Sequence, residues 1–544
     1  MTLRGLFRLL TAWAVFVAIG CVAIARWASL APVPAAEQIV VETTWRGGDR
    51  VGRRVRTRLP TDDAPQGEEV VEIGVAEAPL PALFPLLELT VVPGMDGVRA
   101  TYEKRTAVVT VDDLLKDGAY DRSTPFAELG LGIGTDRQVI LAHLAAQLGV
   151  TAREVEARAS FRRVRMERRV PRAKPAPPIR AAELTPALVR DRMLAAARYL
   201  GRGQDDHGRY RYQVSAASNQ TIAGYNLPRH AGATFFMAQA AGVTGDAGVR
   251  WGTLMAAQYM RAETMGWCGE HRCIVDDGEA NAGSSALAVI AMSEIVLRGI
   301  DASYERDVRE LSAFLRSLQR PDGELMHVYD QAAKRPIDVQ RLYFSGEAAL
   351  ALARAHRITK DPADLEAARR LLARLAGPGW SFFGSRYYWG EEHWTCQAMA
   401  ELWDRAPSEE ALEFCRGWHR YQRKLQYGPG DSPMDADGAF GFGSMVSPRL
   451  TPASSRGEAC GATLAAMRKA HPDDPENAEL SRELDRAVAF VLRHQLAPGP
   501  SHLFSDPNAL AGAMPGSPVD WTIRMDYPQH AGSMMVRWLE LNAR

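Results

Sequence analysis

Two kinds of helix alternate along the C-terminal two-thirds of this chain, and the alternation restricts the possible folds more than any other feature. Helices of the first kind are amphipathic; in residues 304–318 the apolar side chains recur at alternating steps of four and three and therefore share one face. Helices of the second kind are rich in Ala, Gly, Ser and Met and carry few charges. Those of the second kind are predicted at residues 231–241, 282–296, 346–355, 395–403, 457–470 and 531–541.

A closed double ring of helices explains this alternation. An inner helix contacts neighbours on all sides and needs small, uncharged residues, whereas an outer helix faces solvent on one side. Six helix pairs, repeated along the chain, predict an (α/α)6 toroid. We therefore predict a mainly α protein whose residues 185–544 form the toroid. Thr185-Pro186 begins the first helix, because a capping Thr followed by Pro is a typical helix start.

Residues 37–172 show a different, α+β pattern. Residues 98–102 and 106–111 form a predicted hairpin that turns at Glu103-Lys104, and residues 136–148 form a helix that Gly149 ends. We expect an accessory or interaction role for this domain, since its residues form no catalytic constellation. A proline-rich segment, residues 173–184, is the predicted stiff linker to the toroid.

The second half of this domain resembles the latter half of AMMECR-type domains. The resemblance rests on Pro93-Gly94-Met95-Asp96-Gly97-Val98, the hairpin, Ile140-Leu141-Ala142-His143-Leu144-Ala145 and a closing strand. Residues 37–172 contain no cysteine, so the glycine–cysteine motif of that family's first half is missing. The resemblance therefore implies a fold and no activity.

Residues 1–36 have the pattern of a targeting segment. Arg4 and Arg8 precede an apolar run, Leu9 to Ala25, whose length is at the short edge for a membrane span. Basic residues on the leading side favour a cytoplasmic N-terminus. A signal anchor spanning about residues 9–25, a signal peptide cleaved near residues 33–35 and a lipoprotein signal at Cys21 all fit. Each of them places the body of the protein outside the cytoplasm, for example in the periplasm.

Charge and cysteine usage agree with an exported protein that does not bind nucleic acid. The chain has 65 basic and 65 acidic residues and therefore lacks the basic field that nucleic acid would require. Cys268 and Cys273 are close in sequence, and a disulfide between them is expected in an oxidising compartment. Cys396, Cys415 and Cys460 lie on predicted helices, where we expect small buried apolar side chains.

Polar residues gather around the starts of the six small-residue helices. In a toroid these starts converge on one mouth, where the helix N-termini direct partial positive charge. One Glu or His at one helix start is explained equally well by capping, but recurrence at six starts favours a small-molecule site. The candidate catalytic residues are Glu347, Glu392, His230, His393, Glu458 and His530. The candidate substrate-binding residues are Tyr225, Arg229, Asp277, Tyr343, Trp394, Arg456 and Asp526. Residues 428–452 are a candidate lid.

The helix pattern resembles the six-hairpin toroid superfamily, which includes glycoside hydrolases, polysaccharide lyases, sugar epimerases and lanthionine-type cyclases, with terpene cyclases as relatives. Leu318-Gln319-Arg320-Pro321-Asp322-Gly323 resembles segments that recur across this class. The resemblance implies a carbohydrate-active enzyme. Together with the N-terminal segment, it leads us to expect an enzyme of the cell envelope that is anchored to the membrane, and we expect no cofactor. Hydrolysis would use two carboxyls, Glu347 and Glu392 in the first place. Epimerisation would use histidines as proton shuttles.

Two other functions fit the sequence. Trp267-Cys268-Gly269-Glu270-His271-Arg272-Cys273 resembles the Trp-Cys zinc motif of lanthionine cyclases, although the companion Cys-His motif is missing. The toroid could also be a non-catalytic envelope module that binds a glycan or a protein.

Overall fold

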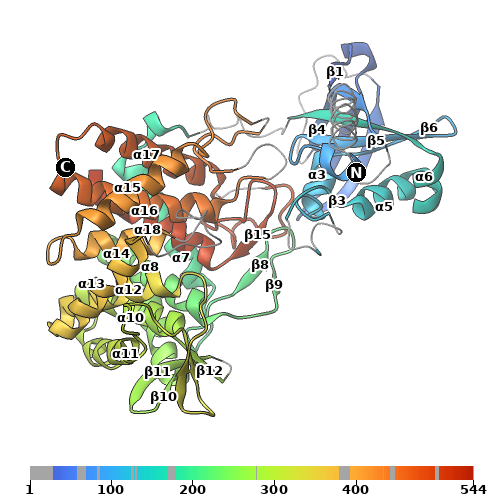
Figure 1. Ribbon diagram of the computed structural model, residues 1–544. Coiled ribbons are helices and arrows are strands. Elements are labelled where there is room, and N and C mark those ends of the chain that lie inside the picture. Colours follow the sequence, from blue (N-terminus) through green and yellow to red (C-terminus); the bar gives the residue numbers. More distant parts are fainter. Residues whose placement is uncertain are drawn as a thin grey trace, which may run out of the picture.

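The computed structural model describes most of the 544-residue chain. The described residues are 29–57, 69–81, 86–123, 128, 132–169, 179–276, 278–378, 392–432, 434–441, 447–496 and 501–542, with Glu392 described by its backbone alone. Within these ranges a sheet domain at the N-terminal side lies beside a large ring of helices (Figure 1). The α+β domain and the helical toroid are thus both present.

An antiparallel sheet with short helices forms the N-terminal domain. The strand order is β3-β2-β4-β7-β5-β6, with β1 paired to β4. The β5–β6 hairpin turns at Glu103 and Lys104 as predicted, with φ of 47° and 71°, the left-handed angles that a two-residue hairpin turn requires. The strands are β1 (Ala31–Pro32), β2 (Val40–Arg46), β3 (Asp49–Arg56), β4 (Glu69–Pro79), β5 (Asp96–Tyr102), β6 (Arg105–Val109) and β7 (Ser160–Arg169). The helices are α2 (Leu86–Thr90), α3 (Val111–Lys116), α5 (Arg137–Leu148) and α6 (Ala152–Arg158).

The inner helices of the toroid close on themselves in the described part of the chain. Each packs against the next in sequence, and α18 packs back against α8, which completes the ring. These helices are α8 (Leu227–Thr244), α10 (Ala282–Leu297), α12 (Phe344–Thr359), α14 (Glu392–Leu402), α16 (Leu450–Ala470) and α18 (Asp526–Asn542). The predicted (α/α)6 toroid is confirmed.

Small residues allow the inner helices to approach closely. A Cβ atom added to Gly532 of α18 would lie 2.0 Å from the Phe236 ring of α8. One added to Gly457 of α16 would lie 2.1 Å from the sulfur of Met534 on α18. Larger residues at these positions would force the helices apart, which explains the composition of the second helix type.

The amphipathic helices form the outer ring, each with its apolar face against inner helices. They are α7 (Pro186–Arg202), α9 (Ala247–Tyr259), α11 (Glu305–Ser317), α13 (Pro362–Ala376), α15 (Glu409–Arg423) and α17 (Glu476–His494). Two small antiparallel sheets emerge between the helices, in the orders β15-β8-β9 and β10-β11-β12-β13-β14. Their strands are β8 (Gln213–Ser215), β9 (Gln220–Ile222), β10 (Met265–Cys268), β11 (His271–Asp276), β12 (Glu279–Asn281), β13 (Val328–Asp330), β14 (Arg335–Ile337) and β15 (Thr522–Arg524).

The hydrophobic core of the N-terminal domain extends onto the toroid, whose helices form a separate core of their own. The apolar cluster of the sheet domain continues into toroid segments through buried Val214, Leu503, Val519 and Ile523. Gly48 brings two backbones together here, since a Cβ atom on it would lie 2.8 Å from the backbone nitrogen of Ser505. The N-terminal domain is therefore packed against the toroid through a buried interface, in addition to its connection through the linker.

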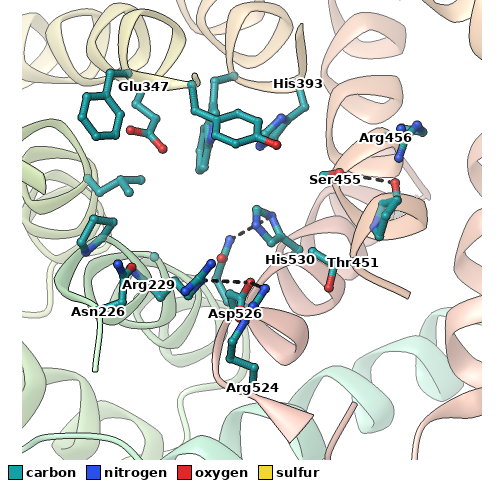
Figure 2. Close-up of a pocket in the computed structure, with 18 residues that line it drawn as sticks. Asn226, Arg229, Glu347, His393, Thr451, Ser455, Arg456, Arg524, Asp526 and His530 are labelled. Carbon is teal, nitrogen blue, oxygen red and sulfur yellow. Dashed lines mark hydrogen bonds and ion pairs between the residues drawn. The ribbon is translucent and has the colours of Figure 1, made fainter. Parts of the chain in front are cut away.

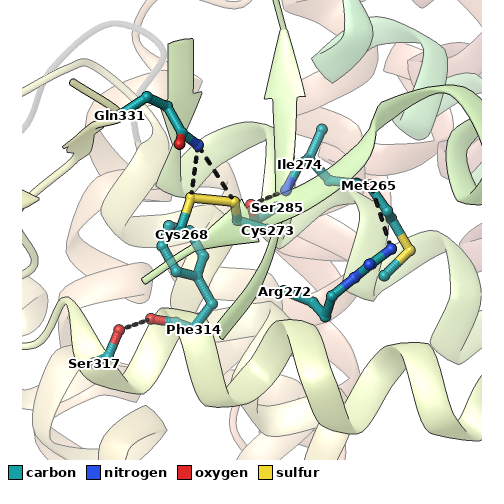
Figure 3. The surroundings of a disulfide bond; sticks show 9 residues. All are labelled: Met265, Cys268, Arg272, Cys273, Ile274, Ser285, Phe314, Ser317 and Gln331. Atoms are coloured by element: carbon teal, nitrogen blue, oxygen red, sulfur yellow. Dashed lines mark hydrogen bonds between the residues drawn. A yellow bond between two sulfur atoms is a disulfide. The ribbon is translucent and has the colours of Figure 1, made fainter. Parts of the chain in front are cut away.

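Two disulfides are present among the described cysteines. The predicted bond between Cys268 and Cys273 is confirmed; it joins β10 to β11, and the Gln331 side chain lies against it (Figure 3). A second bond joins Cys396 of α14 to Cys415 of α15. The prediction that both of these are free apolar residues was wrong, because the sequence does not show that an inner and an outer helix bring them together. Cys460 is buried and free, as predicted.

Several boundaries differ from the predictions. Helix α8 begins four residues earlier than predicted and α16 seven residues earlier, so the polar residues before the predicted starts belong to the first helical turns. The candidate lid stays a prediction, since residues 442–446 lie outside the described residues; in its described part Gly438 packs on the backbone of Arg486 in α17, and the Phe440 ring lies beside the Arg456 guanidinium. The predicted membrane segment lies outside the described residues, and no described helix is long and apolar enough to cross a bilayer. The end of the predicted linker forms the short helix η2 (Ala181–Glu183).

Candidate active site

All six inner helices contribute to one cavity at the end of the ring where these helices begin (Figure 2). Its volume is about 390 Å³, within the range of small-molecule sites. One lining residue from each of α8, α10, α12, α14, α16 and α18 is, in that order, Arg229, Leu287, Glu347, His393, Arg456 and His530. The convergence of inner-helix starts on one site is thus present in the structure.

A histidine–carboxylate pair lies on the α16–α18 side of this cavity. Nδ1 of His530 is 2.7 Å from Oε2 of Glu458, which is buried behind the cavity wall. Burial alone would lower the pKa of His530, but the Glu458 carboxylate outweighs burial, and the pKa lies above its ordinary value. Burial raises the pKa of Glu458, against the opposing effect of His530. Both directions favour a proton held between the two side chains, with Nε2 of His530 left for a ligand.

A second histidine lies beside the first. The ring centroids of His393 and His530 are 5.6 Å apart, and the indole of Trp394 lies 4.7 Å from the His393 ring. Tyr343 closes this aromatic group, with its ring 5.7 Å from that of His393. An imidazole can both donate and accept a proton, so two of them in one partly apolar wall suit proton transfer to and from a ligand.

Two arginines share one carboxylate at the opening between α8 and α18. Arg524 donates to both oxygens of Asp526, at 2.6 and 2.8 Å, and Nε of Arg229 is 3.5 Å from Asp526 Oδ2. Arg229 also donates to the hydroxyl of Tyr212. The Arg229 and Arg524 side chains are 34% and 26% exposed, so N–H donors of both remain accessible to a ligand in the cavity.

Glu347 and Tyr343 line the cavity from the start of α12. Glu347 is buried and points into the cavity (Figure 2). Tyr343, which precedes the helix, has φ of 74°, an angle that a bulky residue rarely adopts. Such backbone strain concentrates at functional sites, and here it places an aromatic ring at the cavity edge.

One cluster in the site has a donor set that could hold a metal ion. Donor atoms of His393, Glu458 and His530 all lie within 4.8 Å of one another. Two histidines and a glutamate are ligands that zinc accepts. The hydrogen bond between His530 and Glu458 already accounts for two of these groups without a metal.

Similarity to known proteins is limited to the fold. No protein-family model and no curated protein matches this chain. A solved cellobiose 2-epimerase from Bacillus thermoamylovorans is 9% identical and covers 65% of this chain and 99% of its own, with a TM-score of 0.50. A D-mannose isomerase is 14% identical, covers 65% and 97%, and has a TM-score of 0.49. A GH76 α-mannanase from Bacteroides thetaiotaomicron is 10% identical, covers 66% and 97%, and has a TM-score of 0.48. The cellobiose 2-epimerase, at 9% identity and a TM-score of 0.50, shows a common fold only. The AMMECR-type resemblance receives no support.

Most of the predicted site residues come together. The cavity is lined by the predicted residues Arg229, Tyr343, Glu347, His393, Trp394, Arg456, Asp526 and His530. Glu458 supports the site from behind through His530. Asp277 and the side chain of Glu392 lie outside the described residues, so the predicted Glu347–Glu392 pair stays a prediction.

His230 and Tyr225 do not line the cavity, contrary to prediction. Nε2 of His230 lies 2.9 Å from the Ala256 carbonyl and must donate to it, so Nδ1 accepts from the Tyr225 hydroxyl at 2.6 Å. Burial lowers the pKa of His230 to about 4. His230 is therefore a neutral structural residue between α8 and α9.

The zinc alternative suggested by the motif at Trp267 does not fit the structure. Cys268 and Cys273 are bonded to each other, and Cys396 is bonded to Cys415. None of these cysteines can provide the thiolate ligand that a cyclase-type zinc centre needs.

Sequence reasoning missed several lining residues. Asn226 caps α8 and lines the cavity, and Arg524 and Gln529 flank residues that were predicted. Thr451 and Ser455 were missed because the start of α16 was placed too late. The sequence did hold a signal for Asn226, Arg524, Gln529 and Ser455, because each is a polar residue one or two positions from a predicted site residue.

Proposed function

We propose that this protein is a carbohydrate-active enzyme of the isomerase or epimerase type, in which His393 and His530 transfer a proton in the toroid cavity. One observation carries the proposal: two imidazoles from different inner helices meet in one wall with ring centroids 5.6 Å apart, and a buried carboxylate holds one of them. This arrangement suits acid–base chemistry on a sugar.

The reaction begins on the open-chain form of a reducing sugar. One imidazole removes the proton from C2, next to the carbonyl carbon, and the electron pair moves to the carbonyl oxygen to give an enediolate. Arg229 and Arg524 present N–H donors to the developing oxyanion, since their guanidinium groups face the cavity.

The second half of the reaction decides the product. If the proton returns to C1 and a hydroxyl proton moves between the oxygens, an aldose becomes a ketose. If it returns to the other face of C2, the sugar is epimerised. The two histidines are neighbours in one wall, which favours transfer of the proton from C2 to C1 on one face of the sugar. Epimerisation at C2 needs an acid on the opposite face, and Glu347 of α12 would supply that proton.

Hydrolysis is the second candidate reaction, and the described carboxylates support it less well. A glycosidase needs two carboxyls beside the scissile bond, one of which donates a proton. Of the two described carboxylates that line the cavity, Glu347 and Asp526, the second already accepts hydrogen bonds from Arg524 at both oxygens. Glu347 would then need a partner from outside this pair.

We further propose that the body of the protein works outside the cytoplasm, held at the membrane by its N-terminal segment. The two disulfides support an oxidising compartment. Fractionation of cells, followed by alkylation of free thiols, tests this location: an alkylated Cys268 or Cys396 in freshly isolated protein would contradict it.

Hydrogen exchange with solvent tests the reaction. Reducing sugars, beginning with cellobiose because a cellobiose 2-epimerase shares the fold, are incubated with the protein in D₂O and followed by ¹H NMR. We expect deuterium at C2 or C1 together with a new sugar, and loss of both signals in His393→Asn. His471→Asn is the matched control, since His471 is an exposed histidine paired with Glu409.

Other outcomes separate the alternatives. Release of a shorter sugar without deuterium at carbon would favour the hydrolase. Binding of a glycan with neither exchange nor cleavage across the panel would favour the non-catalytic module.

A further inference from the structure

The N-terminal domain contacts the parts of the toroid that carry the cavity residues. We define two rim segments. Residues 447–456 enter α16 and include Thr451, Ser455 and Arg456; residues 516–530 enter α18 and include Arg524, Asp526 and His530. Both segments reach the sheet domain before they reach the cavity, so their positions depend on it.

Asp121 holds the first rim segment. Its Oδ1 accepts a hydrogen bond from the Ser447 hydroxyl at 3.0 Å, and both side chains are buried. Asp121 has φ of 58°, in the left-handed region that non-glycine residues seldom occupy. Backbone conformations of this kind persist where the surroundings fix them, which is expected of a residue with a positioning role.

Arg122, the next residue, holds the second rim segment. It donates to the Thr522 hydroxyl at 3.1 Å, and its guanidinium lies 3.9 Å from Asp520. Thr522 begins β15, which leads directly through Arg524 to Asp526, the first residue of α18. A shift at Arg122 would therefore be passed to Arg524 and His530 along a short stretch of chain.

The two rim segments are also tied to each other. Arg449 of the first segment donates to Asp520 of the second at 2.7 Å, and the Leu450 amide donates to the Gly516 carbonyl at 3.0 Å. Val519 packs in the core of the N-terminal domain, where Gly94 leaves room for it. The segments and the domain thus form one connected unit.

We propose that Asp121 and Arg122 are positioning residues for the cavity, so that the N-terminal domain is a working part of the site. Its role is to fix the starts of α16 and α18, and with them the distance between Glu458 on one helix and His530 on the other. This inference concerns the geometry of the cavity and does not depend on which sugar the protein converts.

Amide hydrogen exchange and the titration of His530 test this proposal on the full chain. We expect Asp121→Ala and Arg122→Ala to speed exchange in both rim segments about tenfold, while the outer helices exchange as in the wild type. The NMR titration of histidine-labelled protein should show the pKa of His530 falling, because the contact with Glu458 loosens. Asp121→Asn and Arg122→Lys should restore most of both properties, since they keep the acceptor and the cation.

Lys116→Ala is the matched control. Lys116 is in the same domain interface and donates to the carbonyls of Ala217 and Leu503, which belong to neither rim segment. Ser447→Ala removes the same hydrogen bond from the toroid side and serves if Asp121→Ala does not fold. Unchanged exchange and titration in Ser447→Ala and Arg122→Ala, or equal effects of Lys116→Ala, would overturn the proposal. Both readouts work without turnover, so a failed sugar assay and a failed positioning role are told apart.

Discussion

The starts of α8 and α18 resemble each other in sequence but differ in what their histidines do. Each start has an acidic or amide residue first and a histidine four positions later: Asn226 with His230, and Asp526 with His530. His230 is fully buried and bonded to the Ala256 carbonyl and Tyr225, whereas His530 lines the cavity and is bonded to Glu458.

The neighbouring helix makes this difference: His230 contacts the outer helix α9 through the Ala256 carbonyl, and His530 contacts the inner helix α16 through Glu458. Asn226 is the cap before α8, so His230 is the fourth helical residue; Asp526 is the first residue of α18, so His530 is the fifth. Asn226 and Arg229 nevertheless line the cavity as Asp526 and Gln529 do, so the two helices face the cavity in nearly the same rotation. The position of a histidine in its helix therefore does not decide its role, and the neighbouring helix that it contacts does.

The largest expected effect comes from removing the cavity histidine. His530→Asn should lower the rate of hydrogen exchange into the sugar by about 10²- to 10⁴-fold, the usual contribution of a general acid or base. His230→Asn should leave the rate per folded molecule within about twofold, because His230 does not reach the cavity. The comparison uses steady-state rates divided by the amount of folded protein, which near-UV circular dichroism measures. Equal losses of rate in both variants would contradict the different roles of the two histidines.

The two histidines should also respond to pH with opposite signs. The pKa of His230 is lowered from 6.5 to about 4, so the unfolded chain binds a proton more readily and stability falls as pH drops from 6.5 towards 4. This one group should cost roughly 3 kcal/mol across that range. His530 has a raised pKa, so its contribution is present at low pH and is lost as pH rises through its folded value.

Urea unfolding between pH 4 and 8 measures these contributions. The free energy of unfolding should fall less on acidification in His230→Asn than in the wild type, because the asparagine side chain does not titrate. The same pH dependence in both proteins would show that His230 can take up a proton in the folded state.

The carboxylate behind His530 should have a smaller effect than the histidine itself. Glu458→Gln removes the charge that raises the pKa of His530, so that pKa should fall. The alkaline limb of the pH–rate profile should move to lower pH with it. An unmoved profile, with normal folding, would mean that His530 is not the titrating group.

The smallest expected effect is on the structural side of the comparison. Tyr225→Phe removes the hydroxyl that donates to Nδ1 of His230 and should destabilise the protein by about 1 kcal/mol. It should leave sugar exchange unchanged. Thermal unfolding and the exchange rate, measured on one sample, check both halves, and a fall in rate would place Tyr225 in the site after all.

Part of the site could be predicted because toroid geometry makes helix starts converge. Arg229, Glu347 and His530 follow from their places near the starts of small-residue helices. The same rule gave a wrong prediction for His230, because it identifies the helical turn near the cavity and does not give the direction of each side chain. The bond between Cys396 and Cys415 failed for a related reason, because only packing of α14 on α15 shows that the two meet.

The N-terminal domain shows where patterns become weak. The β5–β6 hairpin and α5 were predictable from alternation and from end signals such as Gly149. Strand β3 was missed, since it lies at the sheet edge and its charged, mostly exposed residues lack alternation. Nothing local in Asp121 or Arg122 signals their contacts with Ser447 and Thr522, which lie near the other end of the chain.

The sequence by itself determined the ring. Apolar periodicity and small-residue composition can be recognised in each helix alone. A closed double layer of six pairs buries the small-residue helices on all sides and the amphipathic helices on one side. The tertiary structure alone decided which histidine faces the cavity, that Cys396 pairs with Cys415 and how the sheet domain holds the rim. Those outcomes depend on which neighbouring helix each side chain meets and on contacts between distant segments, and neither is encoded in any single stretch of the chain.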